Sequence, residues 1–223
     1  QVQQNLETRM ISAYYDPNGV LWIGTNGGGV MCSDLRSQFY SRFYQDRHNE
    51  ICSITMDNDC FVWLATYHKG IMRSMEPYET GKRLQFSTVY SAAGDADETV
   101  LCSLKDAKGN LWFGNKNGEL VAYDVKSRQF SVYTLIIDGN VSTSWVWALY
   151  MDAHGFLWIG TEQGLLLFEP KKGVCRRLPV EQKLNSKEKL VVRAIVQAED
   201  GAIWLGTSNK GCLLYTSDAA DEA

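Results

Sequence analysis

Tyr67, His68 and Lys69 place an aromatic ring, an imidazole and a cation side by side in the sequence. An aromatic face can pack against the C–H surface of a sugar, while charged and amide side chains hydrogen bond its hydroxyl groups. Side chains of the same kinds stand in other segments that we expect to be loops: Trp145, Glu162, Gln163 and Asn209. These seven residues are the predicted ligand contacts, and their chemistry could serve a glycan. Solvated loop tips without a ligand are the alternative.

A second set of expected loop residues carries polar groups with less distinctive chemistry: Asn26, Asp97, Glu98, Lys116, Asn117, Asn140 and Ser208. Trp145 can equally pack inside a blade, and we expect Trp147, two residues later, to be a packing residue. These positions widen the candidate surface without adding a different chemistry.

An enzyme would need an acid, a base or a metal ion within reach of one substrate. His48, His68 and His154 come from separate segments, and no H-x-x-x-H pair, G-x-S-x-G elbow or phosphate-binding glycine loop occurs. The six cysteines show no C-x-x-C spacing, so we interpret them as isolated, largely buried small hydrophobic residues. We predict no catalysis, no metal site and no cofactor in this chain; a lyase or hydrolase is the alternative.

The segments that would position these side chains belong to a fivefold repeat. One copy reads DAHGFLWIGTEQG from Asp152, and its tryptophan has counterparts in the other four: Trp22, Trp63, Trp112, Trp158 and Trp204. Subtracting their numbers gives spacings of 41, 49, 46 and 46 residues. One propeller blade is about 40 to 50 residues long. The spacing therefore predicts five blades.

Each repeat has the pattern of a four-stranded antiparallel sheet. The D-x-x-G segments at Asp16, Asp57, Asp106 and Asp152 are predicted to be tight turns at one end of the strands, with the candidate loops at the other. The tryptophan fills the space between neighbouring blades, and a small residue two positions later permits close packing: Gly24, Gly114, Gly160 and Gly206. We predict an all-β fold, a β-propeller of about five blades with four antiparallel strands each.

Charge and hydropathy exclude several kinds of partner. The 223 residues carry a formal net charge of −4 and no run of basic residues, so we expect no nucleic acid to bind. No apolar run approaches the roughly 20 residues that a membrane-spanning helix needs. We expect contact with a membrane only through a segment outside this sequence.

The repeat D-x-x-G-x-L-W-I-G-T-x-x-G-G resembles the two-component regulator propeller repeat over residues 10–211. This resemblance implies the periplasmic sensor region of a Bacteroidetes-type hybrid two-component histidine kinase, with an oligosaccharide ligand and a homodimer in the full-length protein. It also implies a seven-bladed ring, so we expect this chain to be a fragment and its five blades to form an open arc. Because the ring is incomplete, we expect no saturable glycan binding by this fragment alone. A protein-binding propeller scaffold without signalling output is the alternative.

The last residues have a separate interpretation. The segment CLLYTSDAADE, from Cys212, resembles a one-frame translation of the transposon-end adapter used in sequencing libraries. We therefore expect a partial propeller in residues 1–211 and a non-native tail in residues 212–223. The alternative is an ordinary third strand of the fifth blade, because GCLLY fits the blade pattern.

Overall fold

The structure is a computed structural model, and it describes residues 9–34, 39–44, 50–79, 82–91, 98–180 and 189–215. For residues 34 and 39–44 it describes the backbone alone. The chain forms two compact units, Gln1–Leu111 and Trp112–Ala223, and the division falls at the start of the second strand of the third sheet.

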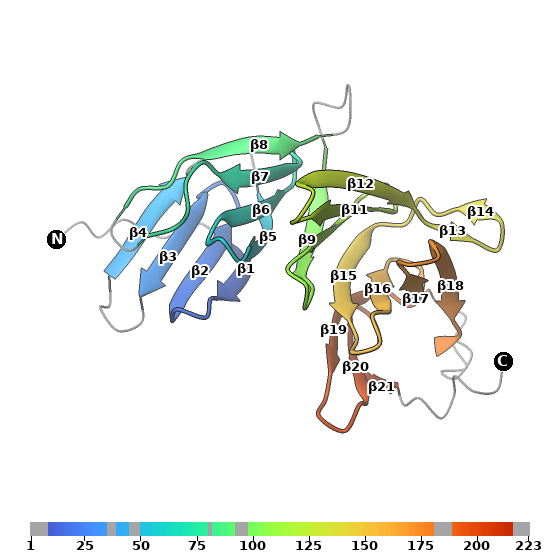
Figure 1. Cartoon of the computed structure of the whole chain (residues 1–223). Coiled ribbons are helices and arrows are strands. Elements are labelled where there is room, and N and C mark those ends of the chain that lie inside the picture. Colours follow the sequence, from blue (N-terminus) through green and yellow to red (C-terminus); the bar gives the residue numbers. More distant parts are fainter. Residues whose placement is uncertain are drawn as a thin grey trace. The chain divides into compact units, whose positions relative to one another are not determined.

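Five sheets of short antiparallel strands are the blades of a β-propeller arrangement (Figure 1). The first two sheets contain β1 (Met10–Tyr15), β2 (Val20–Thr25), β3 (Val30–Asp34) and β4 (Phe39–Tyr44), then β5 (Ile51–Met56), β6 (Val62–Thr66), β7 (Ile71–Ser74) and β8 (Phe86–Tyr90). The third and fourth contain β9 (Val100–Lys105), β10 (Leu111–Asn115), β11 (Glu119–Asp124) and β12 (Gln129–Thr134), then β15 (Val146–Met151), β16 (Leu157–Thr161), β17 (Gly164–Glu169) and β18 (Val174–Leu178). The fifth contains β19 (Val192–Gln197), β20 (Ile203–Thr207) and β21 (Cys212–Tyr215).

The prediction of an all-β propeller with about five blades is confirmed. Four sheets have the predicted four strands in chain order, and the fifth has three described strands. A separate two-stranded hairpin, β13 (Ile136–Ile137) and β14 (Asn140–Val141), follows β12 and has no counterpart among the other described blades. Its side chains are unusually apolar for a surface hairpin, since Ile136 and Val141 are 54% and 61% exposed.

In the first unit, the core fills the space between the first two blades. Trp22 of β2 is fully buried with Ile51 and Leu64 of the second blade, and its ring meets the edge of Tyr78 at 4.7 Å. The Ser12 hydroxyl donates a hydrogen bond to the Ile51 carbonyl oxygen at 3.0 Å. Adjacent blades in this unit are therefore joined by apolar packing and by hydrogen bonds between their innermost strands.

In the second unit, a comparable core lies between the fourth and fifth blades. Leu165 and Leu167 of β17 pack with Val192 and Leu205 of the fifth blade. The centres of the Trp158 and Tyr215 rings lie 5.7 Å apart in an edge-to-face contact, and the rings of Trp22 and Tyr78 in the first unit also meet edge to face. The tryptophan of each of these blades thus packs on an aromatic residue of the blade that follows.

The turn aspartates do more than close their turns. One carboxylate oxygen of Asp16 accepts the backbone N–H groups of Asn18 and Val20, at 2.8 and 3.0 Å, as a D-x-x-G turn requires. The other oxygen accepts the indole N–H of Trp22 at 3.0 Å. The second blade has the same bond between Asp57 and Trp63, at 2.8 Å. Each carboxylate therefore fixes both the turn and the orientation of the core tryptophan, a link that the sequence analysis did not predict.

The turn glycine takes a left-handed conformation, with φ of 87° at Gly19. The second blade has Cys60 at the corresponding position, and its φ is 64°. An L residue with a β-carbon adopts this region at a cost of about 1–2 kcal/mol. The substitution therefore leaves the turn shape unchanged and places the strain in Cys60.

The glycine two residues after the tryptophan lies directly against the next blade. A Cβ on Gly24 would lie 2.8 Å from the carbonyl oxygen of Ile51, and one on Gly160 would lie 2.8 Å from that of Val192. Real Cβ atoms essentially never approach other atoms so closely. The absence of a side chain at these two positions sets the spacing between neighbouring inner strands.

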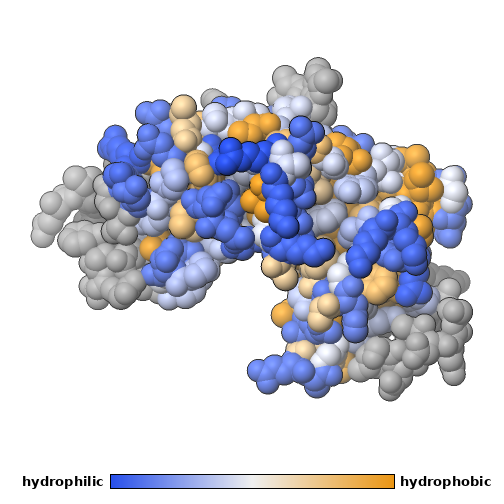
Figure 2. Space-filling view, in the orientation of Figure 1, coloured by the Kyte–Doolittle hydropathy of each residue, from blue (hydrophilic) through white to orange (hydrophobic). Residues whose placement is uncertain are grey.

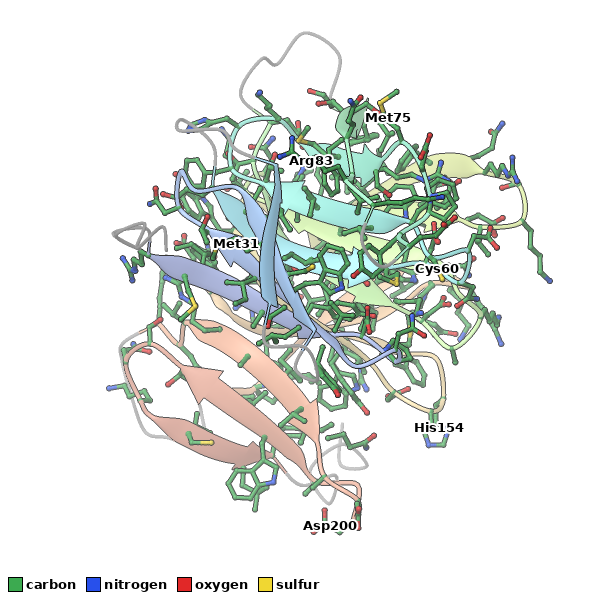
Figure 3. The ribbon with its side chains drawn as sticks, turned by 90° about the vertical axis from the view of Figure 1, so that its left-hand side faces the viewer. Met31, Cys60, Met75, Arg83, His154 and Asp200 are labelled. Carbon is green, nitrogen blue, oxygen red and sulfur yellow. The ribbon has the colours of Figure 1, made fainter. Side chains whose placement is uncertain are left out.

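The fifth blade differs from the others at its tryptophan. Trp204 is 41% exposed, and its register partners Val196 and Leu214 are 58% and 52% exposed. Ala198 stands where the turn aspartate would be, so no carboxylate is in place to accept the indole N–H. Asp200 occupies the exposed tip of this turn (Figure 3) and accepts the backbone N–H of Ala202 instead.

The cysteines and the expected tail are only partly covered by the described residues. All six cysteines are free; Cys32 and Cys102 are buried, Cys52, Cys60 and Cys175 are half-buried, and Cys212 is exposed. Residues 212–215 form the third strand that the blade pattern allows, and residues 216–223 lie outside the described part of the chain. Strand formation does not bear on the origin of these residues, so the non-native tail remains a prediction.

Candidate functional site

The loops between the second and third strands have a common geometry. In four blades a threonine hydroxyl at the end of the second strand donates a hydrogen bond across the loop to a glycine carbonyl: Thr25 to Gly29, Thr66 to Gly70, Thr161 to Gly164 and Thr207 to Gly211. The third blade has Asn115, whose side-chain oxygen accepts the backbone N–H groups of Asn117 and Glu119. These bonds hold each loop in a fixed shape.

The residue after each threonine is tied to the start of the innermost strand of its own blade. Its backbone N–H donates to the carbonyl oxygen of the residue just before or at that start: Asn26 to Arg9, Tyr67 to Glu50, Glu162 to Trp145 and Ser208 to Val191. The structure therefore brings together two of the predicted ligand contacts, Trp145 and Glu162, from loops that are separate in the sequence.

The inner strands β15 and β19 each contain a β-bulge that changes the direction of one side chain. The register shifts between Val146 and Ala148 in β15, and between Val192 and Ala194 in β19. The residues within these bulges are Trp147 and Arg193. The guanidinium carbon of Arg193 lies 3.4 Å from the centre of the Trp147 ring, which is a close cation–π contact. Bulges frequently redirect side chains next to functional sites.

Three further groups surround this stacked pair. The Trp145 ring lies 5.2 Å from that of Trp147, centre to centre. The Ser208 hydroxyl accepts the Nε–H of Arg193 at 3.0 Å. Burial lowers the pKa of the Arg193 guanidinium, and the nearby charge of Glu162 acts in the opposite direction. An arginine nevertheless stays protonated at any physiological pH. We call Trp145, Trp147, Glu162, Arg193 and Ser208 the Trp147–Arg193 cluster.

Asn209 and Gln163 support this region through the backbone. The Asn209 side chain donates to the carbonyl of Lys189 at 2.8 Å and accepts the N–H of Val191 at 3.4 Å, so it holds the segment that leads into β19. The carbonyl of Gln163 accepts a hydrogen bond from Arg177. The hydrogen bonds of the Asn209 side chain thus stabilise the backbone, while Gln163 is held through its main chain.

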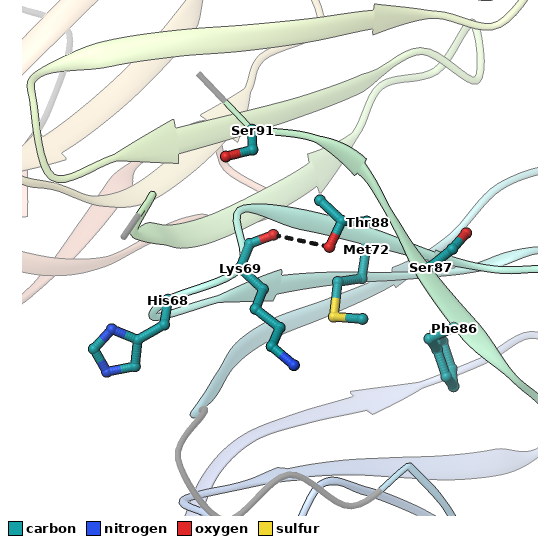
Figure 4. A pocket seen from close by; sticks show the side chains of 7 residues that line it. All are labelled: His68, Lys69, Met72, Phe86, Ser87, Thr88 and Ser91. Carbon is teal, nitrogen blue, oxygen red and sulfur yellow. Dashed lines mark hydrogen bonds between the residues drawn. The ribbon is translucent and has the colours of Figure 1, made fainter. Parts of the chain in front are cut away.

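A second candidate region lies in the first unit, at an open hollow of about 480 Å³. His68, Lys69, Met72, Phe86, Thr88 and two serines, Ser87 and Ser91, line it (Figure 4). The Thr88 hydroxyl donates to the Lys69 carbonyl at 3.4 Å. The Tyr67 ring contacts that of His68 at 4.8 Å but is not among the lining residues. We call this the Lys69 hollow.

The remaining loop candidates have other surroundings. Glu98 is 1% exposed, and its backbone pairs with Lys69 and accepts the N–H of Gly70. Asn140 lies in the β13–β14 hairpin, where its side chain donates to the Asp138 carbonyl. Asp97 lies outside the described residues.

The histidines that an enzyme could use are dispersed among different kinds of site. His154 is exposed at the tip of the β15–β16 turn (Figure 3), and its backbone N–H donates to the Asp152 carboxylate. His48 lies outside the described residues. Within the described ranges, no three His, Cys, Asp or Glu side chains are grouped as metal ligands, and no helix is long and apolar enough to cross a membrane.

Sequence reasoning missed Arg193 and favoured Trp147 as a packing residue. The sequence contains a signal for both residues. Trp147 lies five positions before Asp152, the first residue of its D-x-x-G turn. Arg193 lies five positions before Ala198, the equivalent turn residue of the fifth blade. Equivalent positions of adjacent blades lie side by side, so the repeat register predicts their contact.

Comparison with known proteins bears on the repeat. The sequence profile of the two component regulator propeller matches residues 6–27 and 140–163. Two segments of the chain thus match the two component regulator propeller repeat. The second matched segment includes Trp145, Trp147 and Glu162 of the Trp147–Arg193 cluster. No curated protein matches the sequence.

Solved structures share the fold. The chain aligns with a domain of Bacteroides thetaiotaomicron described as the extracellular domain of the hybrid two component system BT4673, with a TM-score of 0.75, 20% identity and 98% of this chain covered. A second structure of the BT4673 extracellular domain aligns with a TM-score of 0.73 and 21% identity, and the alignment covers 98% of this chain. PorZ, a surface component of the type-IX secretion system of Porphyromonas gingivalis, aligns with a TM-score of 0.66 and 13% identity, and the alignment covers 96% of this chain. The chain spans 28% of either BT4673 chain and 33% of PorZ.

Proposed function

We propose that this chain is part of the extracytoplasmic, ligand-sensing propeller of a hybrid two-component sensor kinase, and that the ligand is an oligosaccharide. The observation that carries the proposal is the Trp147–Arg193 cluster, where two indole rings, a cation and a carboxylate meet on the repeats of a two component regulator propeller. Such a mixture of aromatic faces and polar groups suits a sugar, which has apolar C–H faces and hydroxyl edges.

Signalling in this proposal depends on the longer protein. The ligand binds one of two arrangements of a homodimer more tightly and shifts the population towards it. The kinase and the membrane segment lie beyond this sequence, and the propeller itself performs no chemistry. The similarity to extracellular domains supports a periplasmic or extracellular location.

Calorimetric titration of the purified chain with a panel of neutral and acidic oligosaccharides tests the proposal. The incomplete ring predicts no saturable glycan binding by this chain alone, whereas the Trp147–Arg193 cluster, which lies wholly within residues 145–208, predicts saturable binding to at least one member of the panel. We expect about tenfold weaker binding after Trp145→Ala, because a stacked aromatic contributes roughly 1–3 kcal/mol. Trp204→Ala is the matched control, since it removes an exposed tryptophan outside the cluster. Absence of binding across the panel, or equal losses in both variants, would contradict the proposal.

A protein-binding scaffold is a second candidate function, favoured by the apolar hairpin. Figure 2 shows hydrophobic surface over β13 and β14, to which Ile136 and Val141 contribute. Exposed apolar groups gathered in one region often mark protein contacts. Ile136→Ser with Val141→Ser should abolish partner capture while leaving oligosaccharide binding unchanged if the scaffold candidate is right.

A further inference from the structure

The sensor proposal leaves the chemical class of the sugar open, and Arg193 narrows it. The guanidinium plane is fixed by stacking on Trp147 at 3.4 Å, and its Nε–H is anchored on Ser208 at 3.0 Å. Arg193 is nevertheless an exposed residue. These two contacts use the face and one edge of the guanidinium, so its terminal N–H groups form a fork of fixed orientation.

The charge of this fork is not neutralised by a direct ion pair. Among the described residues no carboxylate lies within 4.0 Å of the Arg193 nitrogens, and Glu162 acts on Arg193 only through its electrostatic field. A planar guanidinium with two free donors matches the geometry of a carboxylate or sulfate and binds it through two parallel hydrogen bonds. The structure therefore offers a pre-organised anion-binding group next to an aromatic platform.

Trp147 supplies a second observation. Its indole nitrogen is buried and has no hydrogen-bond partner within the described part of the chain. A buried donor without a partner costs about 1–3 kcal/mol and calls for an explanation in a native structure. The ring on which the Arg193 guanidinium stacks therefore also carries an unsatisfied donor.

We infer that the Trp147–Arg193 cluster binds an acidic oligosaccharide, with Arg193 holding a sugar carboxylate or sulfate and Trp145 packing against the adjoining ring. The inference rests on the proposed sensor function and specifies its ligand. Glu162 limits the affinity, because its negative charge repels the bound anion, and it thereby disfavours small inorganic anions that lack a sugar ring to stack on Trp145.

Calorimetry with matched probes tests the inference on the complete chain. The probes are oligogalacturonate, its neutral methyl ester, sulfated chondroitin disaccharides and maltotriose. We expect an acidic probe to bind and the methyl ester and maltotriose to bind at least tenfold more weakly. Binding of oligogalacturonate alone identifies the carboxylate as the anion, and binding of the chondroitin disaccharides alone identifies the sulfate.

Four variants separate the contribution of the two-donor geometry of Arg193 from the contribution of its positive charge. Arg193→Gln should weaken binding of the acidic probe by about tenfold or more, and Arg193→Lys by a smaller factor, since it retains the charge but loses the fork. Glu162→Gln should strengthen binding severalfold by removing the like charge. Arg176→Gln, which removes an exposed cation on β18, should leave binding unchanged. Near-ultraviolet circular dichroism of each variant checks that it folds.

The outcomes distinguish this inference from the function on which it rests. Equal binding of the acidic probe and its methyl ester, or unchanged affinity in Arg193→Gln, overturns the acidic ligand class while a sugar sensor survives. Weaker binding in Glu162→Gln also overturns it. Absence of saturable binding by every probe overturns both the inference and the sensor proposal.

Discussion

The carboxylate of Asp16 accepts the indole N–H of Trp22 at 3.0 Å, and both side chains are buried, at 1% and 0% exposure. The same carboxylate holds the turn through two backbone N–H groups. A single residue therefore connects the hairpin at one end of the blade to the core between two blades. The D-x-x-G and W-I-G-T parts of the repeat form one hydrogen-bonded unit.

Asp16→Asn tests this unit. The amide oxygen can still accept the two backbone N–H groups, but the amide nitrogen then faces the indole N–H, so two donors meet in the core. We expect a loss of about 2–3 kcal/mol in the free energy of unfolding, measured by urea titration. Asp200→Asn removes an exposed turn carboxylate and should change it by less than about 0.5 kcal/mol. Equal losses in both variants would show that the indole bond contributes nothing.

Ala198→Asp should restore the missing bond in the fifth blade. The new carboxylate occupies the position of Asp16 and can accept both turn N–H groups and the indole N–H of Trp204. Because Trp204 is 41% exposed, we expect a gain of only about 1 kcal/mol in the free energy of unfolding. The pairing is checked directly by a downfield shift of the Trp204 indole proton, and an unchanged shift would contradict it.

Gly160→Ala tests the close approach between the fourth and fifth blades. The added Cβ would lie 2.8 Å from both the carbonyl oxygen and Cγ1 of Val192. Backbone cannot yield as a flexible side chain can, so we expect a loss of about 1–3 kcal/mol by thermal or urea unfolding. In Gly206→Ala the nearest atom is the Ala194 Cβ at 3.2 Å, and the loss should be smaller. A larger loss at Gly206 would refute the packing explanation.

The Cys52 thiol is expected to make the free energy of unfolding decrease as pH rises in the alkaline range. Burial, assisted by the charge of Glu50, raises the pKa of its thiol to about 12, against about 8.5 for an exposed cysteine. Above pH 9 the unfolded chain therefore releases this proton while the folded chain retains it, so stability falls as pH rises. In Cys52→Ala we expect the free energy of unfolding to decrease less steeply with pH, by up to about 1 kcal/mol per pH unit. Urea titrations between pH 8 and 10.5 measure it, and parallel profiles would contradict the assignment.

The fold could be predicted because every repeat carries the same local signals. The tryptophan spacing gave the blade length, and the D-x-x-G turns gave the strand boundaries. The β13–β14 hairpin was missed although Asp138 and Gly139 form a two-residue turn with positive φ at both positions, which is a known hairpin signal. It was overlooked because it interrupts the blade period instead of following it.

The candidate site was predictable only in part. Trp145 and Glu162 were expected from their loops, and the backbone bond between them follows from the blade geometry. The contribution of Arg193 depends on a bulge in β19, and a bulge has no distinctive composition in one sequence. His68 and Lys69 were likewise expected, but Phe86 and Thr88, which complete the Lys69 hollow, come from a strand whose alternating pattern indicates structure alone.

The indole N–H resonances test the central claim most directly, because the seven tryptophans report separately on core and cluster. In a nitrogen–proton correlation spectrum assigned with Trp→Phe variants, a bound oligosaccharide should shift the signals of Trp145 and Trp147. The signals of Trp22 and Trp63, whose indoles are held by turn aspartates, should stay in place. Shifts confined to other tryptophans, or no shift at saturating sugar, would contradict a ligand site at the Trp147–Arg193 cluster.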